Sequence, residues 1–293
     1  MKAGIRHIGW MHYIGKGAGF LSGCFNINGW REIITFPMGE RAAKPRHQGL
    51  TMVMDKGMGT GETQDLLKLN HPYIDFIKLG FGTSMLYAEG LLEEKIHLAC
   101  SYNIEIYPGG TFFEIALWQD KLIEYLDKCK SLGFTAIEVS DGTINICKEV
   151  RARAISMAAD KGFMVLTEVG KKNAGPGIPA ISLAEQAGED LEMGAHKVIL
   201  EGRECGLNVG LYDAKGKIDN GDMQVLLEHI GDPAKIIWEA PLKPQQQDLI
   251  TRFGSDVNLG NIPPQEVLAL EAMRLGLRAD TLQLMVNDTP VCD

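Results

Sequence analysis

Short runs of aliphatic and β-branched residues recur along the chain, and each run ends in polar or charged residues. Runs of this length and composition are typical of buried β-strands. They are LTMVMDKG (50–57), YIDFIKLG (73–80), IEIYPGG (104–110), AIEVSDG (136–142), FMVLTEVG (163–170), KVILEGRE (197–204), KIIWEAP (235–241) and VNLGNI (257–262). The pattern therefore predicts eight strands.

Segments with a helical period separate these runs. In FFEIALWQDKLIEYLDKCKSLG (112–133) the apolar residues recur at intervals of three and four, and Gly133 marks the expected end of the helix. Strands that alternate with helices pair in parallel. Eight such units that close on themselves predict an α/β fold, the (β/α)8 or TIM barrel. An open doubly wound sheet is the alternative, but it usually has fewer strands, and no GxGxxG follows the first run.

Three parts of the chain are expected: an N-terminal extension (1–45), the barrel (46–286) and a C-terminal tail (287–293). The extension is rich in Gly, Trp and His and lies outside the strand–helix rhythm. Its aromatic residues would expose much apolar area in a free tail, so we expect it to pack on the barrel or on a neighbouring subunit. The segment GKKNAGPGIPA (170–180) is a loop by composition, and its length suggests a lid.

Composition excludes several classes of protein. The hydrophobic fraction of 45% and charged fraction of 23% are those of a soluble globular protein. A net charge of −9 argues against a nucleic-acid partner, and no apolar run is long enough for a membrane span or a signal peptide. The 6 cysteines form no CxxC pair, which favours reduced thiols and a cytoplasmic location.

Every predicted strand ends in polar side chains, and a TIM barrel gathers the carboxyl ends of its strands at the active site. In strand order these residues are Asp55 and Lys56; Lys78, Thr83 and Ser84; Gly109, Gly110 and Thr111; Glu138, Ser140 and Asp141; Glu168, Lys171 and Lys172; Glu201, Arg203 and Glu204; Glu239; and Asn258 and Asn261. Any single glutamate could instead form a salt bridge to a lysine within the barrel. Solvation alone does not explain a whole ring of cations and carboxylates.

Strand alternation predicts which of these side chains face the barrel interior. Leu166 and Glu168 share one face of the fifth strand, and Lys172 has the same parity if the chain stays extended, whereas Lys171 has the opposite parity. By the same count Glu201 and Glu239 point inward. We therefore expect Glu168 and Lys172 inside the barrel mouth and Lys171 at its periphery.

The mixture of charges indicates a site for small anions. Lysine and arginine side chains that converge on one mouth bind phosphate or carboxylate groups, and the backbone amides of the PGGT and GFGTS turns could cradle phosphate oxygens. Carboxylates oppose such a pocket unless a hard cation joins them, and Mg²⁺ binds one to a few carboxylates. The expected metal ligands are Glu168 and Glu201, then Glu138, with Glu239 also on the inner face.

At the level of whole motifs the chain closely resembles the phosphosulfolactate synthase family. The motifs are LTMVMDKG, YIDFIKLGFGTS, YPGGTFFE, AIEVSDGT, LTEVGKK, VILEGRE, IIWEAP, VNLGNI and LEAMRLGLRADT, and they cover about residues 44–281. The resemblance implies a TIM-barrel carbon–sulfur lyase that assembles into homo-oligomers. It also implies Mg²⁺-dependent addition of sulfite to phosphoenolpyruvate, which gives phosphosulfolactate for coenzyme M or sulfolactate biosynthesis.

The resemblance also implies residue roles. The proposed general acid of the family matches the second lysine of the GKK motif, Lys172, beside Lys171. Lys56, Lys78 and Arg203, with the glycine turns of the second and third strands, would hold phosphate and sulfite. Two alternatives stay open: a related lyase that acts on another phosphorylated enol or nucleophile, and a non-catalytic relative that acts through interaction.

Overall fold

The computed structural model describes residues 29–171 and 178–286. The chain divides into two compact units, Met1–Thr35 and Phe36–Asp293. In the first unit the described residues include one turn of 3-10 helix, η1 (Trp30–Glu32). Most of the expected extension (1–28), part of the 170–180 loop (172–177) and the tail (287–293) lie outside the described residues. The boundary between the units falls at Thr35 rather than near residue 45.

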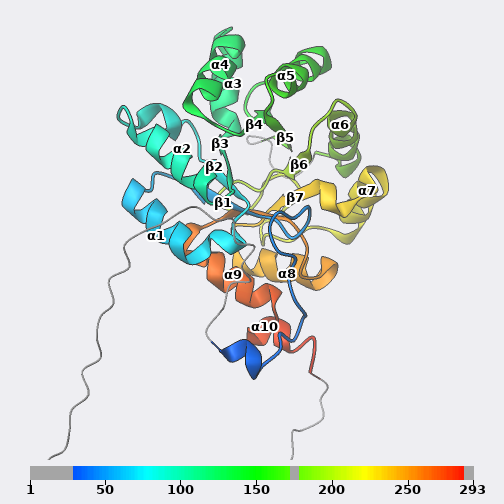
Figure 1. Ribbon diagram of the computed structural model, residues 1–293. Helices are drawn as coiled ribbons and strands as arrows, with labels where there is room; N and C mark the ends of the chain where they lie inside the picture. Colours follow the sequence, from blue (N-terminus) through cyan, green and yellow to red (C-terminus); the bar gives the residue numbers. More distant parts are fainter. Residues whose placement is uncertain (1–28, 172–177, 287–293) are drawn as a thin grey trace, which may run out of the picture. The chain divides into compact units, whose positions relative to one another are not determined.

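All eight expected strands are present in the second unit and form one parallel sheet in the order β3-β2-β1-β8-β7-β6-β5-β4 (Figure 1). They are β1 (Thr51–Asp55), β2 (Phe76–Leu79), β3 (Glu105–Pro108), β4 (Ala136–Ser140), β5 (Met164–Val169), β6 (Lys197–Leu200), β7 (Ile236–Glu239) and β8 (Leu259–Ile262). Between β3 and β4, the Thr135 N–H donates to the Ile106 carbonyl at 3.2 Å, and the Ile106 N–H donates to Thr135 Oγ1 at 3.0 Å. These two bonds bring the ends of the sheet together into a nearly closed barrel.

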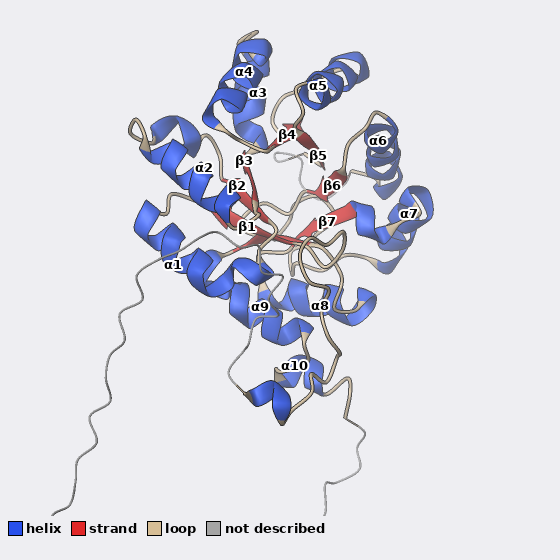
Figure 2. Cartoon of the chain, viewed as in Figure 1, coloured by secondary structure: helices blue, strands red, loops and turns tan. Residues whose placement is uncertain are grey.

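Helices surround the strands on the outside (Figure 2). They are α1 (Thr60–Asn70), α2 (Leu91–Ser101), α3 (Gly110–Trp118), α4 (Leu122–Leu132), α5 (Lys148–Asp160), α6 (Ala180–Glu192), α7 (Asn220–Ile230), α8 (Lys243–Phe253), α9 (Val267–Arg274) and α10 (Ala279–Leu282). Short 3-10 turns complete the connections: η2 (His71–Tyr73), η3 (Thr83–Leu86), η4 (Pro233–Lys235) and η5 (Pro264–Glu266). The expected TIM-barrel class is confirmed.

The single helix expected over 112–133 is two helices, α3 and α4. The break falls at Asp120, whose φ of 55° is left-handed, a conformation that aspartate tolerates better than most residues. The three-residue turn lets the chain change direction without losing the apolar period, and so the period alone does not reveal the break. Gly133 ends α4 as expected, with a φ of 92°.

Alternation along the strands separates two cores, as predicted. Leu166, Ile199 and Ile237 belong to a small cluster inside the barrel, together with Met52 and Tyr107. Val165 and Val169 belong to the large cluster between the strands and the helices. The inner apolar layers therefore fill the barrel below the polar side chains of its carboxyl end.

Residues just after Thr35 are part of the barrel unit. The Arg41 guanidinium donates to Glu271 Oε1 at 3.1 Å and to the Gly49 carbonyl at 2.7 Å. Arg46 forms a bidentate pair with Asp75, with Nη2 at 2.8 Å from Oδ2. These buried contacts explain why the unit begins before residue 45.

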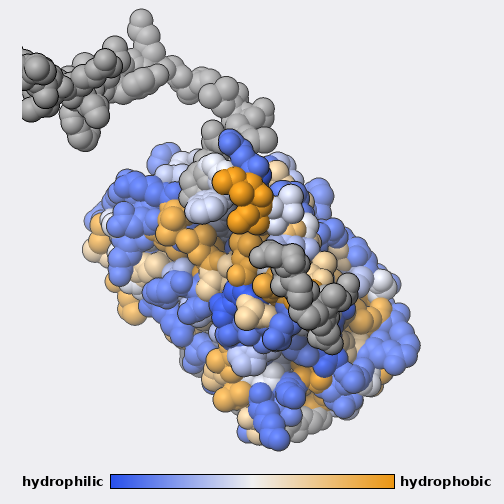
Figure 3. Space-filling model, turned by 90° about the horizontal axis from the view of Figure 1, so that it is seen from below, coloured by the Kyte–Doolittle hydropathy of each residue, from blue (hydrophilic) through white to orange (hydrophobic). Residues whose placement is uncertain are grey.

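The surface and the cysteines fit the composition. On the face shown in Figure 3, hydrophobic residues lie in scattered patches among hydrophilic ones. The four described cysteines, Cys100, Cys129, Cys147 and Cys205, are free thiols. Within the described ranges, no helix combines the length and the apolar character that a bilayer crossing requires.

Candidate active site

One lysine lies at the centre of the carboxyl end of the barrel. Nζ of Lys78, from β2, lies 3.0 Å from Glu138 Oε2, 3.1 Å from Glu168 Oε2 and 3.0 Å from Glu239 Oε1. All four side chains are buried. Burial disfavours the charged lysine, but the carboxylates of Glu138, Glu239 and Glu168 outweigh it and hold the pKa of Lys78 well above its ordinary value.

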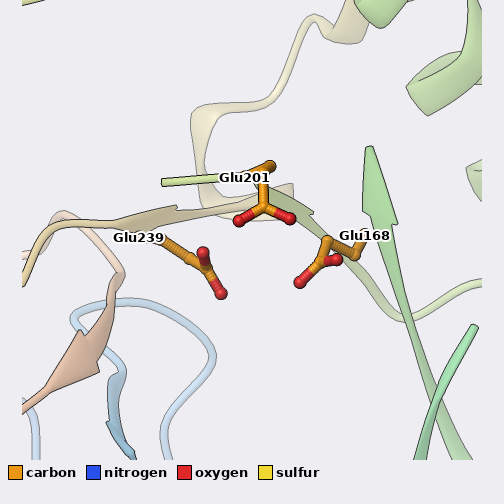
Figure 4. A group of neighbouring side chains, drawn as sticks. All are labelled: Glu168, Glu201 and Glu239. Carbon is orange, nitrogen blue, oxygen red and sulfur yellow. The ribbon is translucent and has the colours of Figure 1, made fainter. Parts of the chain in front are cut away.

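Three glutamates at the ends of neighbouring strands converge on one another, and two of them, Glu168 and Glu239, also contact Lys78. Glu168, Glu201 and Glu239 offer carboxylate oxygens that all lie within 4.8 Å of one another, and Figure 4 shows the three carboxylates pointing toward a common point. Glu168 and Glu239 are strand residues of β5 and β7, and Glu201 follows β6 directly. Each is at most 3% exposed. This inward convergence is what the strand parity predicted.

Backbone amides fix the orientation of these carboxylates. Glu239 Oε2 accepts from the Gly202 and Arg203 N–H groups at 2.9 and 3.0 Å, and Glu201 Oε1 accepts from the Arg203 N–H at 2.7 Å. Two of the glycines have no room for a side chain. A Cβ on Gly202 would lie 2.5 Å from the Glu239 carbonyl oxygen, and one on Gly110 would lie 2.5 Å from Glu138 Oε1. The glycines thus let the backbone approach the acidic groups closely.

A further buried acid, Glu114, completes the group and was missed by the sequence reasoning. Its Oε2 accepts from the Thr143 and Ile144 N–H groups at 2.7 and 2.8 Å, and Ser140 Oγ lies 2.8 Å from Glu114 Oε1 and 2.9 Å from Glu168 Oε1. Glu114 lies on α3 rather than at a strand end. Its position four residues after the glycine that begins α3, in YPGGTFFE, is the sequence signal that could have identified it.

A cavity of about 220 Å³ opens above these groups. Its lining is Met54, Lys78, Phe81, Gly109, Gly110, Thr111, Thr143, Glu168, Glu201, Arg203, Glu204, Glu239 and Asn261. Of the expected substrate-binding residues, the structure therefore brings Lys78, Gly109, Gly110, Thr111, Arg203 and Asn261 to one cavity. Of the expected metal ligands it brings Glu168, Glu201 and Glu239 there, with Glu138 behind them on Lys78.

Several expected substrate residues are placed elsewhere. Lys56 is exposed and lines a neighbouring cavity of about 350 Å³ instead. Thr83 Oγ1 donates to the Gly80 carbonyl at 2.8 Å, and neither Thr83 nor the buried Ser84 lines the 220 Å³ cavity. Ser140 lies beneath the cavity, between two acids. The structure gives these four no direct access to a ligand in this cavity.

The structure places Asn258 away from the carboxyl end of the barrel, where it was expected to bind substrate. It precedes β8, which begins at Leu259, and its side chain binds backbone at the amino-terminal end of the barrel. Nδ2 donates to the Ala234 and Ile236 carbonyls at 2.9 and 2.8 Å, and Oδ1 accepts from the Leu50 N–H at 3.0 Å. Because β8 is four residues long, only Asn261 reaches the carboxyl end.

The glycine turns are also less open to phosphate than expected. The Gly109 N–H donates to the Leu79 carbonyl at 2.8 Å, and the Gly110 N–H donates to Glu138 Oε1 at 2.7 Å. In the GFGTS turn the Gly80 N–H donates to the Asp55 carbonyl at 2.7 Å. These three amides hold the barrel together and so are not available as a phosphate cradle.

Lys171 is held at the periphery, as the parity predicted. Its Nζ donates to Asp141 Oδ2 at 2.8 Å and to the Ile144 carbonyl at 3.2 Å. Asp141 in turn lies 3.2 Å from Arg151 Nη1, and Arg151 forms a buried bidentate pair with Asp190. Lys171 is thus a structural anchor after β5. Lys172, the expected general acid, lies outside the described residues.

The acidic group fits a hard divalent cation. Mg²⁺ prefers oxygen ligands, and Glu168, Glu201 and Glu239 supply three carboxylates in one place. Glu138, Glu168 and Glu239 also surround a single Lys78 ammonium, so these four groups carry an excess of negative charge. Burying such an excess is unfavourable, and a divalent cation would offset it.

A parallel eight-stranded barrel with a charged cavity at the carboxyl ends of its strands defines the class: a TIM-barrel enzyme. The fold is shared with a structure described as a fructose-1,6-biphosphate aldolase of Coccidioides immitis, with a TM-score of 0.52, 15% identity and coverage of 82% of this chain and 92% of that one.

Sequence comparison identifies the family within this class. The family model of (2R)-phospho-3-sulfolactate synthase (ComA) matches residues 39–280. The chain is 46% identical over 244 residues to the phosphosulfolactate synthase of Methanothermobacter thermautotrophicus, covering 83% of this chain and 94% of that protein. It is 38% identical over 246 residues to the phosphosulfolactate synthase of Bacillus subtilis, covering 83% and 96%. The chain belongs to the phosphosulfolactate synthase family.

Proposed function

We propose that the protein is a carbon–sulfur lyase that adds sulfite to phosphoenolpyruvate. The sulfur lone pair of sulfite attacks the methylene carbon and forms the C–S bond. The π electrons of the double bond move toward the carbon that carries the phosphate, and their charge spreads into the neighbouring carboxylate. A proton from a general acid then forms the C–H bond at that carbon. The product is phosphosulfolactate, and no oxidant or reductant is needed.

The observation that carries this proposal is the buried acidic group of Glu168, Glu201 and Glu239 on the floor of a small cavity. The cavity lies in a chain that matches phosphosulfolactate synthases over nearly their whole length. Its volume of about 220 Å³ suits small anionic substrates rather than polymers. Burying carboxylates is costly even when they are paired, and a relative that acts through its surface would not need three of them on the floor of a cavity.

Mg²⁺ held by Glu168, Glu201 and Glu239 would stabilise the negative charge that develops on the substrate carboxylate. The protein's own groups set this up. Lys78 bridges Glu168 and Glu239 and offsets the repulsion between them, and its raised pKa keeps it cationic. It thus serves as a fixed counter-charge rather than as the phosphate ligand that the sequence suggested.

Arg203 and Thr111 are the leading candidates to bind the phosphate and sulfite groups, since both line the cavity and carry donors. Lys172 remains the proposed general acid on the strength of the family motif. Lys171 Nζ donates to Asp141 and to backbone carbonyls, and Lys171 does not line the cavity.

The proposal includes a cytoplasmic homo-oligomer whose product enters coenzyme M or sulfolactate biosynthesis. Large apolar side chains such as Met85, Leu86 and Trp118 are at least 75% exposed in the single chain, and assembly would remove such area from water. Molar mass in solution, measured by light scattering, tests this part separately.

A product assay tests the reaction. Protein treated with EDTA and then supplied with Mg²⁺, phosphoenolpyruvate and sulfite should give phosphosulfolactate, which 31P and 13C spectra identify. Omitting sulfite or Mg²⁺ should abolish the product. A folded protein that forms no adduct with sulfite but consumes phosphoenolpyruvate with another nucleophile would assign it to a different lyase reaction. A folded protein without turnover on any enol phosphate would indicate a non-catalytic relative.

A further inference from the structure

Three described residues that line the cavity have left-handed backbone conformations without being glycine. They are Phe81, Arg203 and Asn261, with φ of 59°, 55° and 54°. Asparagine adopts this region readily, but arginine and phenylalanine do so rarely. Strained residues persist only where the surrounding structure holds them, and they gather at functional sites. The contacts that hold the Arg203 backbone in this conformation therefore point to its role in the site.

The Arg203 peptide connects two of the three acids of the site. Its N–H donates to Glu201 Oε1 at 2.7 Å and to Glu239 Oε2 at 3.0 Å. A single N–H thus sets the separation of two carboxylates that come from different strands. Rotation of the Gly202–Arg203 peptide would break both of these hydrogen bonds and leave Glu239 Oε2 with the Gly202 N–H.

The carbonyl of Arg203, which follows β6, is held by a side chain of β8, two strands away in the sheet. Asn261 Nδ2 donates to it at 3.1 Å, and Asn261 is 3% exposed. This bond fixes the direction of the carboxamide, because the reversed amide would place two oxygens against each other. Asn261 Oδ1 is buried and has no hydrogen-bond partner among the described residues. The side chain therefore keeps its bond to Arg203 even though its own oxygen is left unsatisfied.

We propose that Asn261 is a positioning residue for the acidic group. By binding the Arg203 carbonyl it holds this residue in its left-handed conformation, and the N–H of the same residue spaces Glu201 and Glu239 for a divalent cation. This inference rests on the proposed metal site, which it deepens by naming the residue, three positions from the structural Asn258, that keeps two of its ligands in place. Groups that orient metal ligands without touching the metal typically change metal affinity by ~10–100-fold when they are lost.

Asn261→Asp tests the proposal, because aspartate keeps the size and the tolerance for positive φ but presents an oxygen to the Arg203 carbonyl. The matched control is Asn258→Asp, which alters a buried asparagine at the other end of the barrel. Calorimetric titration of the substrate-free protein with Mn²⁺ or Mg²⁺ should show affinity reduced by ~10–100-fold in Asn261→Asp. Asn258→Asp should lower the melting temperature and leave the affinity unchanged.

A second measurement tests the positioning role of Asn261 in the absence of any metal. Amide hydrogen exchange in the metal-free protein should be at least about tenfold faster at Gly202 and Arg203 in Asn261→Asp, with the strand amides unchanged. If the wild type binds neither Mg²⁺ nor Mn²⁺, the metal part of the proposed function fails, and this exchange result still decides the role of Asn261. Unchanged exchange at both amides would overturn that role.

A rescue distinguishes positioning from direct contact with the metal. In an Asn261→Gly background, Arg203→Gly should recover part of the lost affinity, because glycine adopts the left-handed conformation without steric cost. If Asn261 were itself a metal ligand, the second glycine would restore nothing, and that outcome would overturn the proposal.

Discussion

Nζ of Lys78 lies 3.0 Å from Oε1 of Glu239, although two strands, β1 and β8, separate β2 from β7 in the sheet. The contact crosses the interior of the barrel and exists only because the sheet curls. The same ammonium reaches Glu138 and Glu168 on the other side. One cation therefore joins four strands at the level where chemistry is expected, and this makes it both a structural and an electrostatic centre.

Removing that cation should destabilise the barrel. Lys78→Met leaves three buried carboxylates without their counter-charge, and we expect the free energy of unfolding to fall by about 3–5 kcal/mol. Urea unfolding measures this directly. Added Mg²⁺ should recover part of the loss if the cation binds the same acids. The exposed pair Lys68–Asp65 supplies the control, since Lys68→Met should change stability by less than about 0.5 kcal/mol. Equal effects of the two changes would contradict a central role for Lys78.

The affinity for Mg²⁺ should depend on Glu201. Glu201→Gln keeps an oxygen that can accept from the Arg203 N–H but loses the charge, so we expect Mg²⁺ affinity to fall by at least about tenfold. Glu204→Gln changes an exposed acid on the same cavity and should have little effect. EDTA should stop turnover while the circular dichroism spectrum stays that of a folded barrel. Full activity in EDTA would remove Mg²⁺ from the proposed reaction.

The two lysines after β5 should differ sharply. Lys172→Ala should reduce turnover by the ~10²–10⁴-fold typical of losing a general acid, with substrate binding retained. Lys171→Ala should chiefly lower the melting temperature, because it leaves the buried carboxylate of Asp141 with Arg151 as its remaining cationic partner. Steady-state assays together with thermal melts separate the two effects. Greater loss of turnover in Lys171→Ala would exchange the roles.

Stability should rise in mild alkali because of Lys44. Burial lowers the pKa of Lys44 from 10.5 to about 8 in the folded protein. Between these values the unfolded chain holds the proton more firmly, so the free energy of unfolding increases with pH across this window. From pH 8 to pH 10 the gain of the wild type should exceed that of Lys44→Met by about 2 kcal/mol. Parallel denaturation curves for the two proteins would show that Lys44 does not contribute.

The N-terminal boundary can be tested with two truncations. Removing residues 1–35 leaves the contacts of Arg41 with Glu271 and Gly49, whereas removing residues 1–45 deletes them. The longer truncation should therefore melt at a lower temperature than the shorter one. Light scattering on the shorter form tests whether the extension contributes to a subunit contact, in which case the mass falls. Identical melting temperatures would show that residues 36–45 do not stabilise the barrel.

The strands, their parallel pairing and the inward face of each one follow from local pattern. A two-residue period depends only on which side of a strand a residue occupies, and it placed Glu168, Glu201 and Glu239 correctly before any contact was known. The same count failed at Asn258, because it cannot say at which residue a strand begins. It also missed the break at Asp120, since a short turn leaves the helical period intact.

The tertiary structure alone decided which charged and polar side chains pair with one another. Sequence shows that Lys78 and Glu138 are charged residues at the ends of strands, but it does not show that they pair with each other, because that depends on barrel closure and distance. The same holds for Glu114, which reaches Ser140 from a helix, and for the bond from Asn261 on β8 to Arg203 after β6. Periodicity is a property of neighbours along the chain. Electrostatic pairing and hydrogen bonding are set by atoms within a few ångströms in space, and only the folded barrel brings those atoms together.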